Sequence, residues 1–99
     1  MADVKVSVLR IVDVSQPGFV EFELVDCNGI NHHFIDKIPV ICDSEKCEYD
    51  SIPPYDGYMR CNIIRETSNT VIIDTSKPDG IESLNGEYQF EVYKDQVII

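Results

Sequence analysis

The stretch FVEFELVDCNGINHHF, residues 19–34, carries the strongest structural signal in this chain of 99 residues. Apolar and charged side chains alternate along its first half, with Val20, Phe22 and Leu24 on one side and two glutamates on the other. Alternation with a period of two is typical of a strand that buries one face. A turn sequence and a second strand-like run follow, so this stretch predicts a β-hairpin.

The turn Asp26-Cys27-Asn28-Gly29 decides how the two strands of this hairpin align. Asp at the first position, Asn at the third and Gly at the fourth suit a type I turn followed by a glycine bulge. That turn places Phe22 opposite Phe34 and directs His32 inward. A two-residue Asn-Gly turn would shift the alignment by one residue and direct His33 inward instead. We expect the first alignment because it brings two aromatic rings together on one buried face.

Alternation recurs along the rest of the chain. We expect further strands over residues 4–8, 58–66, 70–75 and 87–93, with a bulge near Leu9 and Arg10. In the last strand, Tyr88, Phe90 and Val92 should face inward. Only residues 77–84 could form a helical turn.

Short strands joined by turns, without a long helix, indicate a single all-β domain over residues 1–99. The expected fold is a small barrel (OB-like or SH3-like) or a compact sandwich of about six antiparallel strands. We favour the barrel because closure removes exposed sheet edges.

Composition narrows the classes of partner. Eighteen carboxylates against eight basic side chains give a net charge of −10, and nucleic-acid binding depends largely on cationic contacts with phosphate. We therefore expect no nucleic-acid partner. No apolar run approaches the roughly 18 residues of a membrane span, and the amino-terminal residues lack the apolar centre of a secretory signal. These features predict a cytoplasmic protein without a membrane partner.

Three of the four cysteines and both histidines lie within residues 27–47, so a metal site has to be considered. Structural zinc sites use two pairs of closely spaced ligands, and the cysteine spacings of fifteen, five and fourteen positions do not supply them. The combination that could converge is His32 with Cys42 and Cys47. We expect no metal and no cofactor, and Cys61 should be a small buried residue. The alternative is a small-molecule or zinc-binding barrel with a histidine at its mouth.

Catalysis requires a nucleophile, a base and an orienting group in one place. Ser44 or Ser51 could approach a histidine, but no G-x-S-x-G elbow, phosphate-binding glycine motif or calcium loop is present. We therefore expect a protein that is not an enzyme and has no catalytic residues.

Residues 43–58, DSEKCEYDSIPPYDGY, form the longest expected loop, and loops of this kind often carry function. Tyrosine among acidic residues suits a protein-binding surface, because tyrosine supplies contact area at low entropic cost. The expected partner is another protein, and the chain itself should be a monomer or a weak homodimer. One form of this function is an immunity-type protein that neutralises a basic toxin. The alternative is that these tyrosines only pack the loop onto the barrel. The candidate contact residues are Tyr49, Asp50, Tyr55, Asp56 and Tyr58.

Three further segments are DGYMRC at 56–61, IDTSKPDGIES at 73–83 and FEVYKDQV at 90–97. With QPGFVEFELVD and FIDKIPV earlier in the chain, they resemble a family of small bacterial all-β proteins that share a DT-x-x-P-x-G-I-E-S loop. The resemblance covers most of the chain and implies a bacterial, cytoplasmic, single-domain protein. It also implies that Pro78, Gly80 and Glu82 hold a defined loop conformation. It carries over no catalytic or binding residue.

Overall fold

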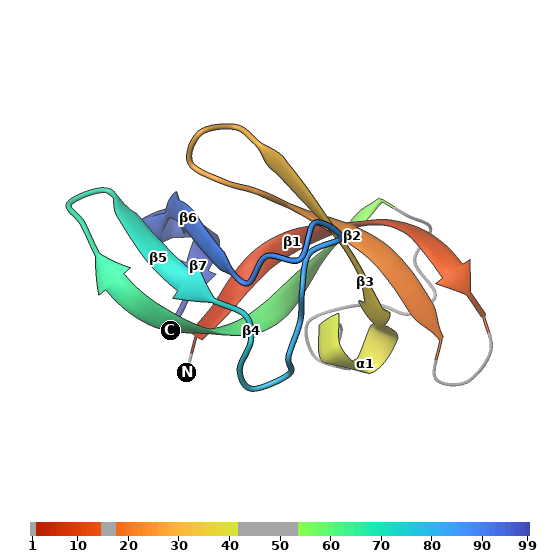
Figure 1. Ribbon diagram of the computed structural model, residues 1–99. Coiled ribbons are helices and arrows are strands. Elements are labelled where there is room, and N and C mark those ends of the chain that lie inside the picture. Colours follow the sequence, from red (N-terminus) through yellow and green to blue (C-terminus); the bar gives the residue numbers. More distant parts are fainter. Residues whose placement is uncertain (1, 15–17, 42–53) are drawn as a thin grey trace.

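The computed structural model, which describes residues 2–14, 18–41 and 54–99, shows an all-β protein (Figure 1). Two short helical turns interrupt the strands: α1 (Ile38–Ile41) after β3, and the 3-10 turn η1 (Lys94–Gln96) after β6. Neither turn approaches the length of a membrane-spanning helix, and no other helix occurs among the described residues. The strands are β1 (Ala2–Asp13), β2 (Phe19–Val25), β3 (Asn31–Lys37), β4 (Tyr55–Glu66), β5 (Thr70–Asp74), β6 (Gln89–Tyr93) and β7 (Val97–Ile98).

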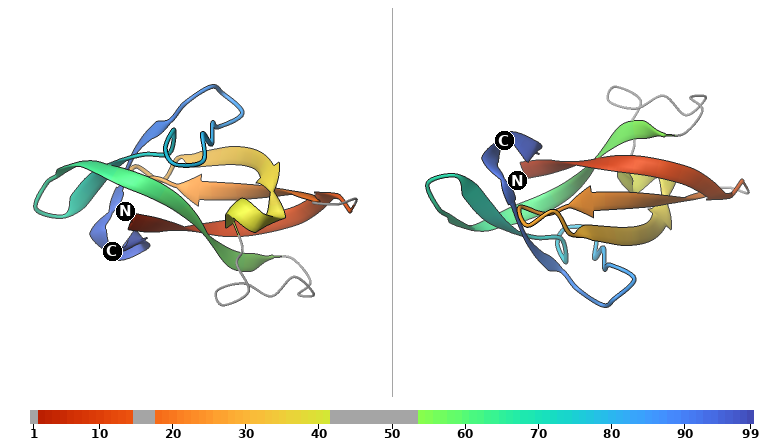
Figure 2. Two further views of the ribbon diagram at one scale, coloured as in Figure 1. Left: turned by 90° about the horizontal axis from the view of Figure 1, so that it is seen from below. Right: turned by 90° about the horizontal axis from the view of Figure 1, so that it is seen from above.

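The strands form one antiparallel sheet in the order β3-β2-β1-β4-β5-β6, and β7 pairs with β1. β1 and β4, with 12 residues each, run through both halves of the molecule. The sheet curls around them into a half-barrel (Figure 2). After β6 the chain passes through η1 to β7, which pairs with β1, so the last strand lies beside the first.

The hairpin alignment predicted from the turn sequence is confirmed. Phe22 lies opposite Phe34, and Leu24 lies opposite His32. Gly29 has a φ of 78°, a backbone conformation that glycine adopts without steric cost. The carboxylate of Asp26 accepts hydrogen bonds from the backbone N–H groups of Asn28 (2.9 Å) and Ile30 (3.0 Å), so the turn satisfies its own polar groups. The predicted bulge in β1 is also present, as a register shift against β2 between Val8 and Arg10.

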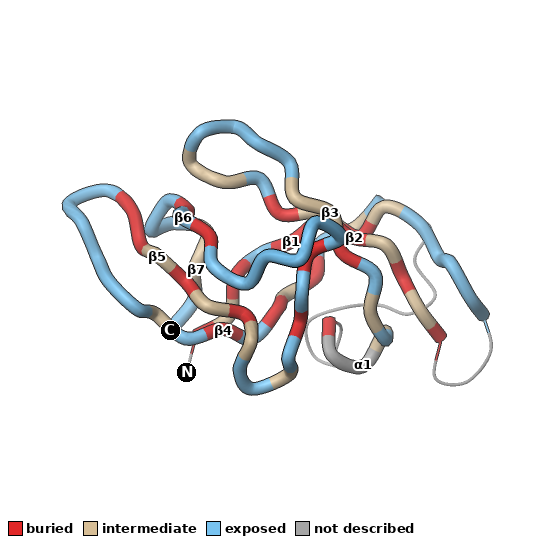
Figure 3. Tube along the Cα trace, viewed as in Figure 1, coloured by how far each residue is buried: buried red, intermediate tan, exposed pale blue. Residues whose placement is uncertain are grey.

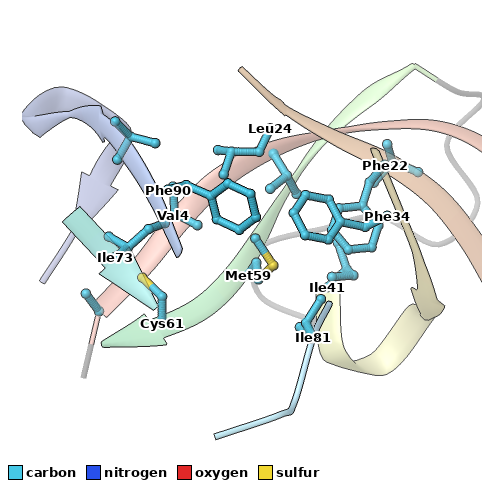
Figure 4. Packing of buried hydrophobic residues seen from close by; sticks show 14 of the residues in the cluster. Val4, Phe22, Leu24, Phe34, Ile41, Met59, Cys61, Ile73, Ile81 and Phe90 are labelled. Carbon is cyan, nitrogen blue, oxygen red and sulfur yellow. The ribbon is translucent and has the colours of Figure 1, made fainter. Parts of the chain in front are cut away.

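The core lies inside the curled sheet, where buried and exposed residues alternate along the strands (Figure 3). The rings of Phe22 and Phe34 are stacked, with centroids 5.0 Å apart and an interplanar angle of 4°. Phe90 from β6 meets Phe34 edge-on at 5.6 Å, so residues of two separate hairpins share one aromatic cluster (Figure 4). Cys61 is fully buried in the same core, as expected. Other fully buried core members are Val4, Val8, Val20, Leu24, Met59, Ile73, Ile81 and Val92.

Two local predictions near β6 are wrong. The strand begins at Gln89, and Tyr88, expected to face inward, is 37% exposed. Residues 77–84, the only stretch expected to allow a helical turn, form none, and the helical turns are α1 and η1 instead. Both differences have one cause: Thr75 bridges the loop, because its N–H binds the carbonyl of Tyr88 (2.9 Å) and its carbonyl accepts the N–H of Ile81 (3.0 Å). These bonds hold the loop in an irregular conformation that buries Ile81 in the core.

Candidate protein-binding surface

The end of the predicted binding segment is a strand rather than a loop, because β4 already begins at Tyr55. Alternation therefore separates the candidate residues. Tyr55 is half-buried and packs against the core, whereas Asp56 is exposed and Tyr58 lies on the same outward side of β4. Tyr49 and Asp50 lie outside the described residues. Of the five candidates, the structure thus brings Asp56 and Tyr58 together on an outer surface.

Gly57, between these two residues, allows close packing at the start of β4. A Cβ atom at this position would lie 2.8 Å from Cγ2 of Ile41 and 3.3 Å from Cγ2 of Val8. Only glycine therefore lets α1 and β1 approach β4 this closely. The close approach packs α1 against the start of β4.

Carboxylates on the outer side of β1, β2 and the start of β4 face cations. Asp56 pairs with Lys5 at 3.3 Å, and Glu21 accepts a hydrogen bond from Nε of Arg10 at 2.7 Å. The bond from Arg10 lowers the pKa of Glu21, and a further contact with Nδ1 of His33 at 3.2 Å acts in the same direction. Much of the negative charge on this side is therefore compensated within the protein.

On β5 and β6 the carboxylates are held by uncharged donors instead. Asp74 accepts hydrogen bonds from the N–H and hydroxyl of Ser76, which lower its pKa, and attraction by Lys77 is the smallest effect in that direction. Glu91 accepts the hydroxyl proton of Thr70 at 2.6 Å. A neutral donor satisfies a carboxylate without cancelling its charge.

We call the outer surface of β5, β6 and the loop between them, with its carboxylates and tyrosines, the acidic face. Glu82 belongs to it because it hydrogen-bonds the hydroxyl of Tyr88 and raises the pKa of that phenol. Tyr93, 49% exposed, stands on the same outward side of β6 as Glu91. The acidic face consists of Asp74, Glu82, Tyr88, Glu91 and Tyr93.

Sequence reasoning missed the acidic face because its members are spread over twenty positions. The signal that could have found it is alternation: Asp74 and Glu91 each fall on the outward side of their strands. Placing them side by side also needed the pairing of β5 with β6, in which Ile72 lies opposite Glu91 and Asp74 opposite Gln89.

The two histidines occupy different environments, as the predicted alignment requires. His32 is directed inward, 11% exposed, with Nε2 at 2.7 Å from Oδ2 of Asp26 and its ring 4.7 Å from that of Phe90. His33 is directed outward between Glu21 and Glu23. Burial raises the pKa of Asp26, but hydrogen bonds from His32 and from two backbone N–H groups outweigh that effect and lower it.

Nothing in the described part of the chain assembles a metal centre: no three His, Cys, Asp or Glu side chains there are grouped to hold an ion. Cys42 and Cys47 lie outside the described residues, and His32 already uses one nitrogen to bind Asp26. Burial raises the pKa of the Cys61 thiol to about 11, and burial together with Glu91 and Asp26 raises that of Cys27. A raised pKa disfavours the nucleophilic thiolate at both positions.

A surface hollow of about 310 Å³ lies beside the first residues of β1 and the carboxyl-terminal residue. It is lined by Ala2, Asn62, Ile63 and Ile99. Among the described residues, no histidine and no tyrosine line it. This hollow therefore gives no support to the alternative of a small-molecule barrel with a histidine at its mouth.

Comparisons with protein-family models, with curated proteins and with solved structures found no match to this chain. The resemblance to the small bacterial family remains a prediction.

Proposed function

We propose that this protein is a non-enzymatic binding module that recognises a basic protein through its acidic, tyrosine-bearing outer surface. The observation that carries the proposal is the acidic face. Its carboxylates are held by hydroxyl groups and amides, so their charge is available to a partner. Two exposed tyrosines accompany them, and tyrosine is enriched among the residues that dominate binding energy at protein interfaces.

The described end of the predicted segment, at the start of β4, faces the same side of the sheet as the acidic face. Asp56, Tyr58, Arg60 and Asn62 alternate outward along β4, and Asn62 lies opposite Asp74 of β5. Asp56 is paired with Lys5, so in this proposal the acidic face supplies the charge. The start of β4, with residues 43–53 before it, supplies further contact area.

The proposed partner carries a basic surface, and immunity-type neutralisation of a basic toxin in the cytoplasm is one form of this function. Complementary charge accelerates encounter and suppresses wrong partners, and its effect weakens as salt screens it. A basic protein encoded beside this chain would be the first partner to examine.

Affinity capture from host lysate at low and high ionic strength tests the proposal. The informative variant is Asp74→Asn with Glu91→Gln, which removes two charges and keeps the hydrogen-bond acceptors. The matched control is Glu23→Gln with Asp36→Asn, which removes two charges from β2 and β3. We expect wild type and control to retain the same basic protein at low salt, and the acidic-face variant to bind it roughly tenfold more weakly, a change of about 1.4 kcal/mol.

Two outcomes would contradict the proposal. If wild type retains no basic protein at low salt, the binding function itself should be abandoned. If the two double variants bind equally well, the acidic face is not the contact surface.

A further inference from the structure

His32 joins the β2–β3 hairpin to the turn at residues 83–87, which precedes β6. Its Nε2 lies 2.7 Å from Asp26, and its Nδ1 lies 3.7 Å from Oε1 of Glu87. The next residue of β3 contributes a backbone link, because the N–H of Leu84 donates to the carbonyl of His33 at 2.8 Å. The turn is therefore attached to β3 at two adjacent residues.

The 83–87 turn is compact in itself. The N–H of Ser83 donates to the carbonyl of Glu87 (2.9 Å), and the N–H of Glu87 donates to the Ser83 hydroxyl (3.0 Å). These two bonds close the base of the turn, and its contacts with β3 are made by Leu84 and Glu87.

The environment of Asp26 fixes which nitrogen of His32 carries the proton. The Asp26 carboxylate is 11% exposed and accepts two backbone N–H groups besides the imidazole. An ionised acceptor so placed requires a donor at Nε2 in both charge states of the ring. A neutral imidazole has only one N–H, so Nδ1 of neutral His32 presents a lone pair to Glu87. Only the imidazolium presents an N–H and a positive charge to both carboxylates, with Glu87 at ion-pair distance.

We propose that His32 is a proton-dependent latch, which fastens the 83–87 turn to β3 when its ring is protonated and releases Glu87 when the ring is neutral. The contact with Glu87 is therefore strengthened when the ring is protonated and is weakened as rising pH removes the proton. The side chain of Glu87 is 49% exposed, so it can turn to solvent on release.

The other neighbours of His32 do not replace this pairing. Leu24 faces it from β2 and Phe90 from β6, and both are uncharged. The carboxylate of Glu91, also on β6, is engaged by Thr70. Burial raises the pKa of the Cys27 thiol in the hairpin turn, so this thiol adds no negative charge that could compete for His32.

Release of Glu87 from His32 would change the acidic face whether or not the proposed partner exists. Tyr88 follows Glu87 directly in the chain, and Glu82 precedes the turn. Loosening of the turn would therefore change how these two residues are presented to solvent.

Amide hydrogen exchange measured by NMR between pH 5.5 and 8 tests the latch. Exchange is expressed as a protection factor, so that the intrinsic base catalysis of exchange cancels. In wild type we expect protection of the Leu84 amide to fall about two- to fivefold as pH rises, the modest change typical of a half-exposed ion pair. Protection of the Thr75 amide, which binds the Tyr88 carbonyl within the same protein, should not follow this change.

Glu87→Gln is the informative variant, because residue 87 is exposed and its substitution should not disturb folding. It should abolish the pH dependence at Leu84. The control Glu21→Gln removes a carboxylate from His33 instead and should preserve that dependence. A wild-type Leu84 amide whose protection is constant over this range, or a Glu87→Gln variant that keeps the pH dependence, would overturn the proposal.

Discussion

The β2–β3 and β5–β6 hairpins both direct carboxylates outward, but they hold them in different ways. In the first hairpin Glu21 faces Arg10 and His33, so its charge is largely cancelled. In the second, Asp74 and Glu91 are held by serine and threonine hydroxyl groups, which do not cancel their charge, and Lys77 attracts Asp74 only weakly. Formal charge along the sequence therefore does not locate the negative field of the folded protein. The identity of the donor at each carboxylate locates it.

Beneath these outer surfaces the two hairpins share one core, which gives the largest expected effect. Phe34→Ala would remove a ring that stacks on Phe22 and meets Phe90 edge-on, so residues of both hairpins would lose packing. We expect the free energy of unfolding to fall by about 3–5 kcal/mol, measured by urea denaturation. The neighbouring variant Ile35→Ala, on the outer side of β3, should cost less than about 1 kcal/mol. Equal losses in the two variants would show that the hairpins do not depend on a common core.

How much of this arrangement could be predicted from the sequence differs between the hairpins. For β2–β3, the turn Asp26–Gly29 fixes the register through contacts between near neighbours, and the inward direction of His32 follows from it. For β5–β6, the preceding loop is shaped by Thr75, which binds residues 6 and 13 positions away. No local pattern encodes those bonds, so the position of Tyr88 was predicted wrongly.

The candidate site divides in the same way. Alternation along β4 specifies that Asp56 and Tyr58 face outward, once the start of the strand is known. That start is set by pairing with β1, where Tyr55 lies opposite Val8, and the sequence of β4 alone does not show this pairing. The acidic face joins residues of two strands and the loop between them, so it became visible only with the sheet pairing.

Acid unfolding sharpens the comparison, because Asp26 faces a histidine and Asp74 does not. The pKa of Asp26 is lowered in the folded protein from its ordinary value of 3.8. A lowered carboxyl pKa stabilises the fold above that ordinary value, and the contribution is lost as pH falls through the folded-state pKa. Asp26→Asn should therefore cost about 1–2 kcal/mol at pH 7, and progressively less below about pH 4.

Urea midpoints of wild type and variant between pH 7 and 3 measure this effect. Asp74→Asn in the other hairpin should cost less, because the amide oxygen still accepts the bonds from Ser76 and no histidine loses its partner. A difference between wild type and Asp26→Asn that stays constant down to pH 3 would show that the Asp26 charge does not stabilise the turn.

The smallest expected effect tests the comparison most directly. Glu21→Gln removes the partner of Arg10, whose side chain is 62% exposed, so the free energy of unfolding should fall by only about 0.2–1 kcal/mol at low salt. Glu91→Gln keeps an oxygen for the Thr70 hydroxyl and removes one charge from an acidic protein, so its stability should be unchanged or slightly higher. Thermal midpoints at low and high salt distinguish the two, because salt should reduce the loss in Glu21→Gln by screening the pair.

A loss of equal size in Glu91→Gln would mean that a cation compensates Glu91. Arg65 of β4, which lies opposite Ile72 of β5, would be the first residue to examine. The acidic face would then lack the free charge on which recognition of a basic partner depends.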